Sequence, residues 1–442
     1  MAELLSVGLD VGTTSTQMVV SRLAVSNRAS GFAVPELTIA RREILYQSPV
    51  YFTPLLEEKR MDAQALRQIV EREYRAAGLS REKVDTGAII VTGETSRKEN
   101  AAAVLEALAD LAGDFVVAAA GPDLESVLAA KGSGAAEYSE QTGETVLHMD
   151  IGGGTSNLAL ICRGEIIATG CLNVGGRLVK LQDEIITYVS PVLSGLWDGQ
   201  VGETLTRQRG EELAALLASA LEMAAGLKPS DGLLERLTTR EAANALPLNP
   251  PGQPITISFS GGVADCIERE IPWQKFGDIG PLLGQAIRKS RLCQGKYVLG
   301  SQTIRATVIG AGCHSTQLSG STVFCQRVPL PLKNIPVITG PEQRGQYETP
   351  CFYALAGVDA PDYQALSELA EEIAAVLEPP IYLCLEADMA KALGQTLALK
   401  LGRDTPILCL DRVKVTQGSF LDVAAPVGPA FPVVVKTLVF EK

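Results

Sequence analysis

Two short stretches of this chain place an aspartate at the end of an apolar strand and follow it with glycine and hydroxyl residues. The first is GLDVGTTST, with Asp10 before Gly12, Thr13 and Thr14, and the second is MDIGGGTSN, with Asp150. Glycine lets backbone N–H groups approach a ligand closely, and hydroxyls add hydrogen-bond donors, so such turns suit phosphate oxygens. The aspartate adds a carboxylate near the Mg²⁺ that accompanies nucleotide phosphates, usually through a water molecule.

The two aspartates lie 140 residues apart, which makes the second stretch a repeat of the first. Its loop consists of Gly152, Gly153, Gly154 and Thr155. A single Asp-x-Gly hairpin is a common structural feature and would be weak support for a phosphate site. Two copies predict two duplicated lobes that face each other across one nucleotide, with Asp10 and Asp150 beside its Mg²⁺.

The elements around the loops alternate between strands and helices, which indicates an α/β protein. In the first part we expect strands over 4–11, 16–23, 39–47, 86–92 and 114–119, and helices over 62–78 and 97–111. In the second part we expect strands over 145–151, 156–162, 165–170 and 255–260, and helices near 177–182 and 208–227. The last hundred residues add strands near 381–386, 406–410 and 432–440.

A chain of 442 residues is too long for one core. We expect a first lobe over 1–140, a second lobe with an adenosine loop over 141–340, and a C-terminal α/β segment over 341–442. That last segment either docks a partner or completes the core of the second lobe. Two alternatives therefore remain for it.

Composition excludes several classes of protein. The net charge of −12 argues against a nucleic-acid partner, because phosphate contacts need clustered Lys and Arg. No apolar run reaches the length of a membrane span, so we expect a cytoplasmic protein without membrane contact. Nine scattered cysteines without a C-x-x-C pair indicate reduced thiols, and two histidines exclude a histidine-rich metal site.

The two loops resemble the phosphate loops of the superfamily that contains actin, heat-shock chaperone ATPases and sugar kinases. The resemblance implies an actin-like ATPase fold, with two duplicated RNase H-like lobes around a nucleotide cleft. LESVLAAKGSG, before the second loop, is similar to the first interdomain helix of that superfamily. The similarity implies that Glu125 lies near the γ-phosphate and positions or activates the attacking water. The alternative is an ordinary helix that ends at a glycine.

Two glycine pairs follow the same pattern. CLNVGGRLVKL contains Gly175 and Gly176 and resembles the pair below the nucleotide, although a tight turn between a strand and a helix would explain it equally well. ITISFSGGVADC contains Gly261 and Gly262 and looks like the adenosine loop, where glycines leave room for the base and ribose.

Two further stretches complete the superfamily pattern. RATVIGAGCH resembles the second interdomain helix, with Gly310 and Gly312 at close-packing positions. IIVTGETSRKE places Gly93 and Glu94 at a strand end, where Glu94 either faces the cleft or caps a helix.

The whole chain resembles the reactivating factors of ethanolamine ammonia-lyase. QSPVYFTP, GDFVVAAAGPDLESVLA, FGDIGPLL and RATVIGAGCHSTQLSGST carry this resemblance, which is looser in the tail. It implies a molecular chaperone that hydrolyses ATP to ADP and phosphate with Mg²⁺. Its partner would be ethanolamine ammonia-lyase, an adenosylcobalamin enzyme, from which it releases damaged cobalamin so that intact cofactor can bind. The family context adds an association with an ethanolamine-utilisation microcompartment.

Other functions on this fold stay open at this point. A small-molecule kinase would need a catalytic aspartate aimed at a substrate hydroxyl, and none identifies itself outside the two loops. A filament-forming ATPase would assemble with ATP, and a pure binding module would show no turnover. Fold alone does not choose among these classes.

Overall fold

The computed structural model describes most of the chain. The described residues are 2–12, 15–27, 37–57, 60–80, 83–92, 104, 108, 116–119, 121–239, 244–250, 253–314, 316–319, 323–347, 349–358, 361–415, 419–426 and 431–437. Thr13, Thr14, Gly93, Glu94 and most of the expected helix over 97–111 lie outside them.

The first sheet has six strands in the order β3-β2-β1-β7-β8, and β4 also pairs with β2. Its strands are β1 (Ala2–Val11), β2 (Ser15–Asn27), β3 (Leu37–Gln47), β4 (Tyr51–Phe52), β7 (Thr86–Val91) and β8 (Val116–Ala119). The small hairpin of β5 (Leu55–Glu57) and β6 (Arg60–Met61) leads into α1 (Ala63–Ala76). Asp62 caps α1 by accepting the Ala65 N–H, and Leu66 and Val70 pack against Leu9 of β1.

The second sheet repeats this order as β11-β10-β9-β14-β15. Its strands are β9 (Thr145–Ile151), β10 (Ser156–Cys162), β11 (Glu165–Leu172), β14 (Thr256–Ser260) and β15 (Tyr297–Leu299). Around it lie α4 (Ala135–Thr142), α5 (Arg207–Ala224), α6 (Gly232–Leu237), α7 (Gly280–Lys289) and three 3₁₀ turns, η3 (Pro191–Leu193), η4 (Ala264–Cys266) and η5 (Arg291–Cys293). In both sheets a hairpin is followed by a strand parallel to its first strand. The predicted actin-like duplication is therefore present.

The expected helix near 177–182 is wrong. Residues Val179–Gln182 form β12, which pairs with β13 (Ile185–Val189). Along β12, Val179 and Leu181 are buried while Lys180 and Gln182 are exposed. That alternation has the period of a strand and buries one face.

The third sheet has eight strands in the order β16-β23-β22-β18-β19-β20-β21-β17. They are β16 (Thr316–Ser319), β17 (Phe324–Gln326), β18 (Leu332–Ile338), β19 (Phe352–Leu355), β20 (Ile381–Leu385), β21 (Ile407–Leu410), β22 (Ser419–Val423) and β23 (Phe431–Thr437). The helices α9 (Tyr363–Val376) and α10 (Ala390–Leu401) cover one face, and η6 (Pro341–Gln346) follows β18. Because β16 pairs with β23 and β17 pairs with β21, the sheet begins at residue 316, earlier than the expected segment over 341–442. The division into domains stays a prediction.

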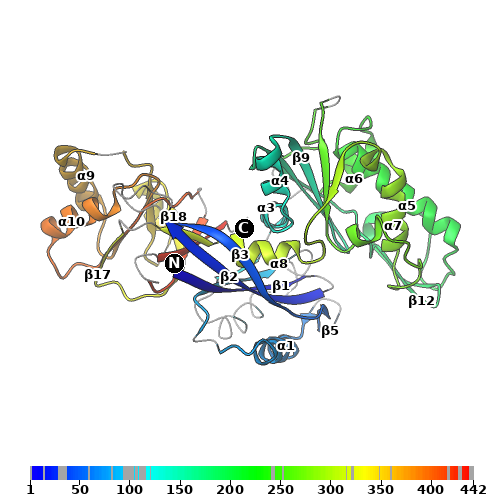
Figure 1. Ribbon diagram of the computed structural model, residues 1–442, viewed down its shortest axis with the longest axis horizontal. Helices are drawn as coiled ribbons and strands as arrows, with labels where there is room; N and C mark the ends of the chain where they lie inside the picture. Colours follow the sequence, from blue (N-terminus) through cyan, green and yellow to red (C-terminus); the bar gives the residue numbers. More distant parts are fainter. Residues whose placement is uncertain are drawn as a thin grey trace.

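Two helices lie between the first and second sheets (Figure 1). α3 (Pro122–Gly132) contacts β9, β10 and β11, and α8 (Ala306–His314) contacts β1, β2 and β7. They cross so closely that a Cβ on Gly132 would lie 1.9 Å from the Ala306 carbonyl oxygen, and one on Gly310 would lie 2.1 Å from that of Leu128. The two glycines therefore allow backbone contact between the helices. Among the helices of the described residues, none has the length and apolarity that crossing a membrane requires.

Candidate functional site

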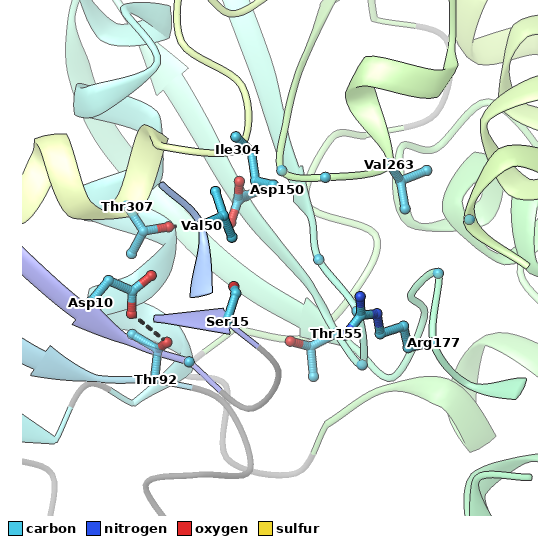
Figure 2. Close-up of a pocket in the computed structure, with 18 of the residues that line it drawn as sticks. Asp10, Ser15, Val50, Thr92, Asp150, Thr155, Arg177, Val263, Ile304 and Thr307 are labelled. Atoms are coloured by element: carbon cyan, nitrogen blue, oxygen red, sulfur yellow. Dashed lines mark hydrogen bonds between the residues drawn. The ribbon is translucent and has the colours of Figure 1, made fainter. Parts of the chain in front are cut away.

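A cavity of about 470 Å³ opens between the first two sheets, within the usual size range for small-molecule sites. Both predicted loops line it with Gly12, Ser15, Gly152, Gly153, Gly154 and Thr155. Gly176, Gly261 and Gly262 of the predicted glycine pairs line it as well, whereas Gly175 does not. Figure 2 shows Asp10 and Asp150 reaching the cavity from the two sheets.

The described parts of the two loops have the same geometry. The Gly12 N–H donates to the Ser15 carbonyl at 2.8 Å, and the Gly152 N–H donates to the Thr155 carbonyl at 2.9 Å. A Cβ on Gly12 would lie 3.1 Å from the Ser15 carbonyl oxygen, so the first turn leaves little room for a side chain. Thr13 and Thr14, which the sequence assigns to the first loop, are outside the described residues.

Asp10 and Asp150 are buried carboxylates at the floor of the cavity, 7% and 9% exposed. Asp10 accepts from the Thr92 hydroxyl at 2.8 Å, and Asp150 accepts from the Ser260 and Thr307 hydroxyls. Burial raises the pKa of Asp10 to about 7, and the nearby charge of Asp150 adds to the effect. Burial likewise raises the pKa of Asp150 to about 6.

These raised pKa values mean that the described surroundings do not compensate the two negative charges fully. A divalent cation between them would supply that compensation, so the pair fits a Mg²⁺ ion. No cluster of three or more metal-ligating side chains occurs among the described residues. Two carboxylates suffice for Mg²⁺, which keeps several waters and takes further oxygens from substrate phosphates.

Glu125 reaches the same cavity from α3 and is 7% exposed. The Asn157 side-chain amide donates to its Oε2 at 2.8 Å, and Asn157 lies opposite Asp150 in the sheet. The structure therefore brings together the three predicted side chains Asp10, Glu125 and Asp150.

The glycine pairs differ in what they do. A Cβ on Gly175 would lie 2.3 Å from the Gly153 carbonyl oxygen, and the Gly176 N–H donates to the Gly152 carbonyl at 3.0 Å. The Gly175–Gly176 pair therefore packs against the backbone of the second loop and holds it in place. Gly261 has φ +86° and a Cβ there would meet the Ile151 backbone, whereas a Cβ on Gly262 would lie 3.9 Å from Ile304 Cδ1, an ordinary contact distance. The second pair leaves room in the cavity.

Several polar groups of the site were not predicted from the sequence. His148 is fully buried and lies 2.9 Å from the hydroxyl of Ser260, which donates to Asp150. Burial lowers the pKa of His148 to about 3, so its imidazole stays neutral. Arg177 and Asp278 also line the cavity and form an ion pair at 3.1 Å. Arg177 directly follows the Gly175–Gly176 pair, and this position next to a predicted site motif could have indicated it as a site residue.

The repeated strand order and the paired aspartate–glycine loops at one cavity define an actin-like fold of the nucleotide-binding ATPase class. The family model described as ethanolamine utilisation protein EutA matches residues 2–351 and 344–441. This chain belongs to the EutA family.

Two curated relatives match the chain over nearly all of its length. The protein named ethanolamine ammonia-lyase reactivase EutA from Salmonella typhimurium is 38% identical over 472 aligned positions, which cover 99% of each chain. The protein of the same name from Escherichia coli is 38% identical over 470 positions, again with 99% of each chain covered.

Solved structures are similar over part of the chain. A Ppx/GppA family member from Aquifex aeolicus has a TM-score of 0.42 and 14% identity, and the alignment covers 70% of this chain and 97% of that one. The ethanolamine utilization protein EutJ from Carboxydothermus hydrogenoformans has a TM-score of 0.34 and 16% identity, with 70% and 88% covered. The fold assignment depends on the strand order of the two sheets and not on these two structures.

Proposed function

We propose that this protein is an ATP-dependent reactivating factor for ethanolamine ammonia-lyase. The observation that carries the proposal is the full-length relationship to two proteins named ethanolamine ammonia-lyase reactivase. In this function the protein binds the inactivated lyase, loosens it so that damaged cobalamin leaves, and allows intact adenosylcobalamin to enter. We further propose that it works in the cytoplasm, in association with an ethanolamine-utilisation microcompartment.

The proposed nucleotide site is the cavity between the two lobes. The N–H groups of the two glycine loops bind the phosphates, and the opening at Gly262 takes the adenosine. Asp10 and Asp150 hold Mg²⁺ through its water ligands, and the ion neutralises charge on the phosphates. The buried hydroxyls of Thr92 and Ser260 keep the two carboxylates oriented.

Glu125 is the proposed water-positioning residue for hydrolysis. Its carboxylate is fixed by the Asn157 amide, so it presents one defined orientation to the cavity. A carboxylate so placed accepts a hydrogen bond from a water molecule and orients it for attack on the terminal phosphate. Because Glu125 belongs to α3, hydrolysis is linked directly to the helix pair between the lobes.

ATP and ADP then favour different angles between the lobes, since the terminal phosphate interacts with loops of both. The crossing of α3 and α8 is the contact about which the angle changes. A partner that binds the protein more tightly at one interlobe angle is therefore bound or released as the nucleotide changes. The segment over 341–442 is the proposed docking element for the lyase.

The test is to mix the purified protein with lyase blocked by cyanocobalamin, together with ATP, Mg²⁺ and free adenosylcobalamin. We expect recovery of deaminase activity that needs ATP and Mg²⁺, with release of cyanocobalamin. The control omits ATP or replaces it with a nonhydrolysable analogue. Recovery that is equal without nucleotide, or no recovery with it, would contradict the proposal.

A further inference from the structure

The cavity carries far more acidic than basic side chains. Five carboxylic acids line it, and they are Asp10, Glu125, Asp150, Asp265 and Asp278. Among the described lining residues, Arg177 is the basic one. A nucleotide polyphosphate brings additional negative charge, so the position of this arginine matters for binding.

Arg177 is fixed to the second loop by its backbone. Its N–H donates to the Gly153 carbonyl at 2.7 Å, so the residue moves with that loop. Its side chain is occupied by two neighbours. Nε lies 3.1 Å from Asp278 Oδ2, and the guanidinium lies over the Phe52 ring, 5.2 Å from the ring centroid.

Phe52 is fixed to the first loop in a comparable way. Its strand β4 pairs with β2, so Phe52 stands opposite Ser15. The next residue, Thr53, donates its hydroxyl to the Gly12 carbonyl at 2.7 Å. The preceding residue, Tyr51, donates its hydroxyl to Glu73 of α1. Phe52 is nevertheless 76% exposed, so its ring is held in position without being part of the core.

The contact between Arg177 and Phe52 therefore joins the two loops across the cavity. Figure 2 shows Arg177 beside Thr155 of the second loop. A cation over an exposed aromatic ring contributes little. In the ion pair the Asp278 side chain is 7% exposed and that of Arg177 is 25% exposed, so this contact is the stronger of the two. The Gly280 N–H, 2.8 Å from Asp278 Oδ1, remains as a donor to this carboxylate when the guanidinium moves away. Polyphosphate oxygens offer the guanidinium a stronger, bidentate partner. The Phe52 contact is therefore easily exchanged for that partner, and the Asp278 contact competes with it.

We propose that Arg177 is a nucleotide-operated latch, which holds Asp278 and Phe52 in the empty protein and transfers to the phosphates of a bound nucleotide. The transfer releases Phe52 and so uncouples the first loop from the second. The inference rests on the proposed nucleotide site and adds a specific residue through which the phosphates control the contact between lobes.

Two substitutions are expected to change nucleotide affinity in opposite directions. Arg177→Ala removes the phosphate partner, so Mg·ADP and Mg·ATP should bind roughly tenfold more weakly or worse, while adenosine binding changes little. Asp278→Asn removes the competing carboxylate but keeps the acceptor for the Gly280 N–H, which lies 2.8 Å from Asp278 Oδ1. In that variant the same nucleotides should bind several-fold more tightly. Isothermal titration calorimetry measures all of these affinities.

Arg209→Ala is the matched control. Arg209 is in the same lobe, pairs with Asp198 at 2.9 Å and Glu203 at 3.2 Å, and lies over the Trp197 ring at 5.5 Å. It has the same kinds of contact outside the cavity, so its removal should leave nucleotide affinity unchanged. If Arg177 is merely structural, both Arg177→Ala and Asp278→Asn will weaken binding, and this result would overturn the inference. Equal weakening of adenosine and Mg·ATP would also overturn it.

A second measurement follows the ring itself. Phe52→Trp in protein labelled with 5-fluorotryptophan adds one ¹⁹F resonance to those of the two native tryptophans. Mg·ATP should shift the added resonance, and this shift should be lost when Arg177→Ala is combined with it. A shift that persists without Arg177 would contradict the latch. Suppose that the wild-type protein binds Mg·ATP and reactivates the lyase while the variants give these contrary results. That combination would refute the latch and leave the proposed function intact.

Discussion

Asp10 and Asp150 occupy equivalent positions in the two sheets, and each stands opposite an amide side chain on the neighbouring strand. The partner of Asp10 is Gln17, and the partner of Asp150 is Asn157. Each amide donates a hydrogen bond to the chain at or next to one of the two crossing helices. Gln17 donates to the carbonyl of Ile304, just before α8, whereas Asn157 donates to Glu125 of α3, both at 2.8 Å. The strands β2 and β10, which neighbour those of the two aspartates, are thereby tied to the chain just before α8 and to α3, respectively.

The first prediction concerns the paired carboxylates. Asp10→Asn or Asp150→Asn should reduce ATP turnover by roughly 100-fold or more, because a Mg²⁺ ion held by these carboxylates would stabilise developing charge by several kcal/mol. The fold should remain, since Asn keeps the acceptor for Thr92 or Ser260. Phosphate release and circular dichroism measure the two effects. Asp183→Asn, on an exposed turn, is the control. Normal turnover in either site variant would show that the metal lies elsewhere.

The second prediction concerns pH. The pKa of Asp10 rises from its ordinary 3.8 to about 7 in the folded protein, so the folded state holds this proton more tightly. Its contribution to stability is complete below pH 3.8 and is lost as the pH rises through 7. Without divalent cations, Asp10→Asn should therefore exceed wild type in unfolding free energy at pH 8, by about 1–3 kcal/mol, and by less at pH 5. Urea unfolding at a series of pH values measures this, and a difference that does not vary with pH would contradict it.

The third prediction separates hydrolysis from binding. Glu125→Ala should bind Mg·ATP with near wild-type affinity and lose most hydrolysis, because a water-positioning group acts mainly in the transition state. Asn157→Ala should lower turnover by less, since it removes the group that orients Glu125 and leaves the carboxylate itself. Calorimetry and single-turnover kinetics distinguish the two. An equal loss of binding and turnover in Glu125→Ala would indicate a purely structural helix.

The fourth prediction tests the helix crossing. Gly132→Ala should destabilise the protein by ~3 kcal/mol, because its Cβ would overlap the backbone of α8 and force the helices apart. Gly121→Ala, at the N-cap of the same helix, meets no atom within 4 Å and should cost only about 0.5–1 kcal/mol, because alanine is a poorer N-cap than glycine. Thermal unfolding compares the two variants. Similar stabilities would mean that the close approach of α3 and α8 is not essential.

Sequence reasoning located the features that depend on neighbouring residues. The aspartate–glycine loops, the Gly261–Gly262 turn and the capped helix α1 each have a local signature, and the repeat itself implied two facing lobes. The helix predicted near 177–182 was wrong, because an apolar run after a glycine pair is compatible with a helix or a strand. Only the pairing with β13 makes this segment a strand. The roles of Arg177 and Phe52 depend on a contact between residues 125 positions apart, which no local pattern encodes.

The boundary of the C-terminal segment was also not predictable from local sequence, because it depends on strand pairing. A cut after residue 344 would leave β16 and β18 in the fragment and remove their partners β23, β22 and β19. Unpaired apolar strands of this kind aggregate. A cut after residue 315 removes the third sheet as a whole, and it keeps the first two sheets and both crossing helices.

The last prediction uses this cut to test the proposed docking role. The fragment 1–315 should fold, keep most of the ATPase activity and fail to reactivate the lyase, because the described part of the cavity lies within residues 10–307. Circular dichroism, phosphate release and lyase reactivation are measured on the same preparation, with the full chain as the reference. Reactivation by the fragment would exclude docking through the removed segment. An insoluble fragment would favour a core-completing role for this segment, but at the first sheet and not in the second lobe as expected, because β3 and β8 contact β16 and β23.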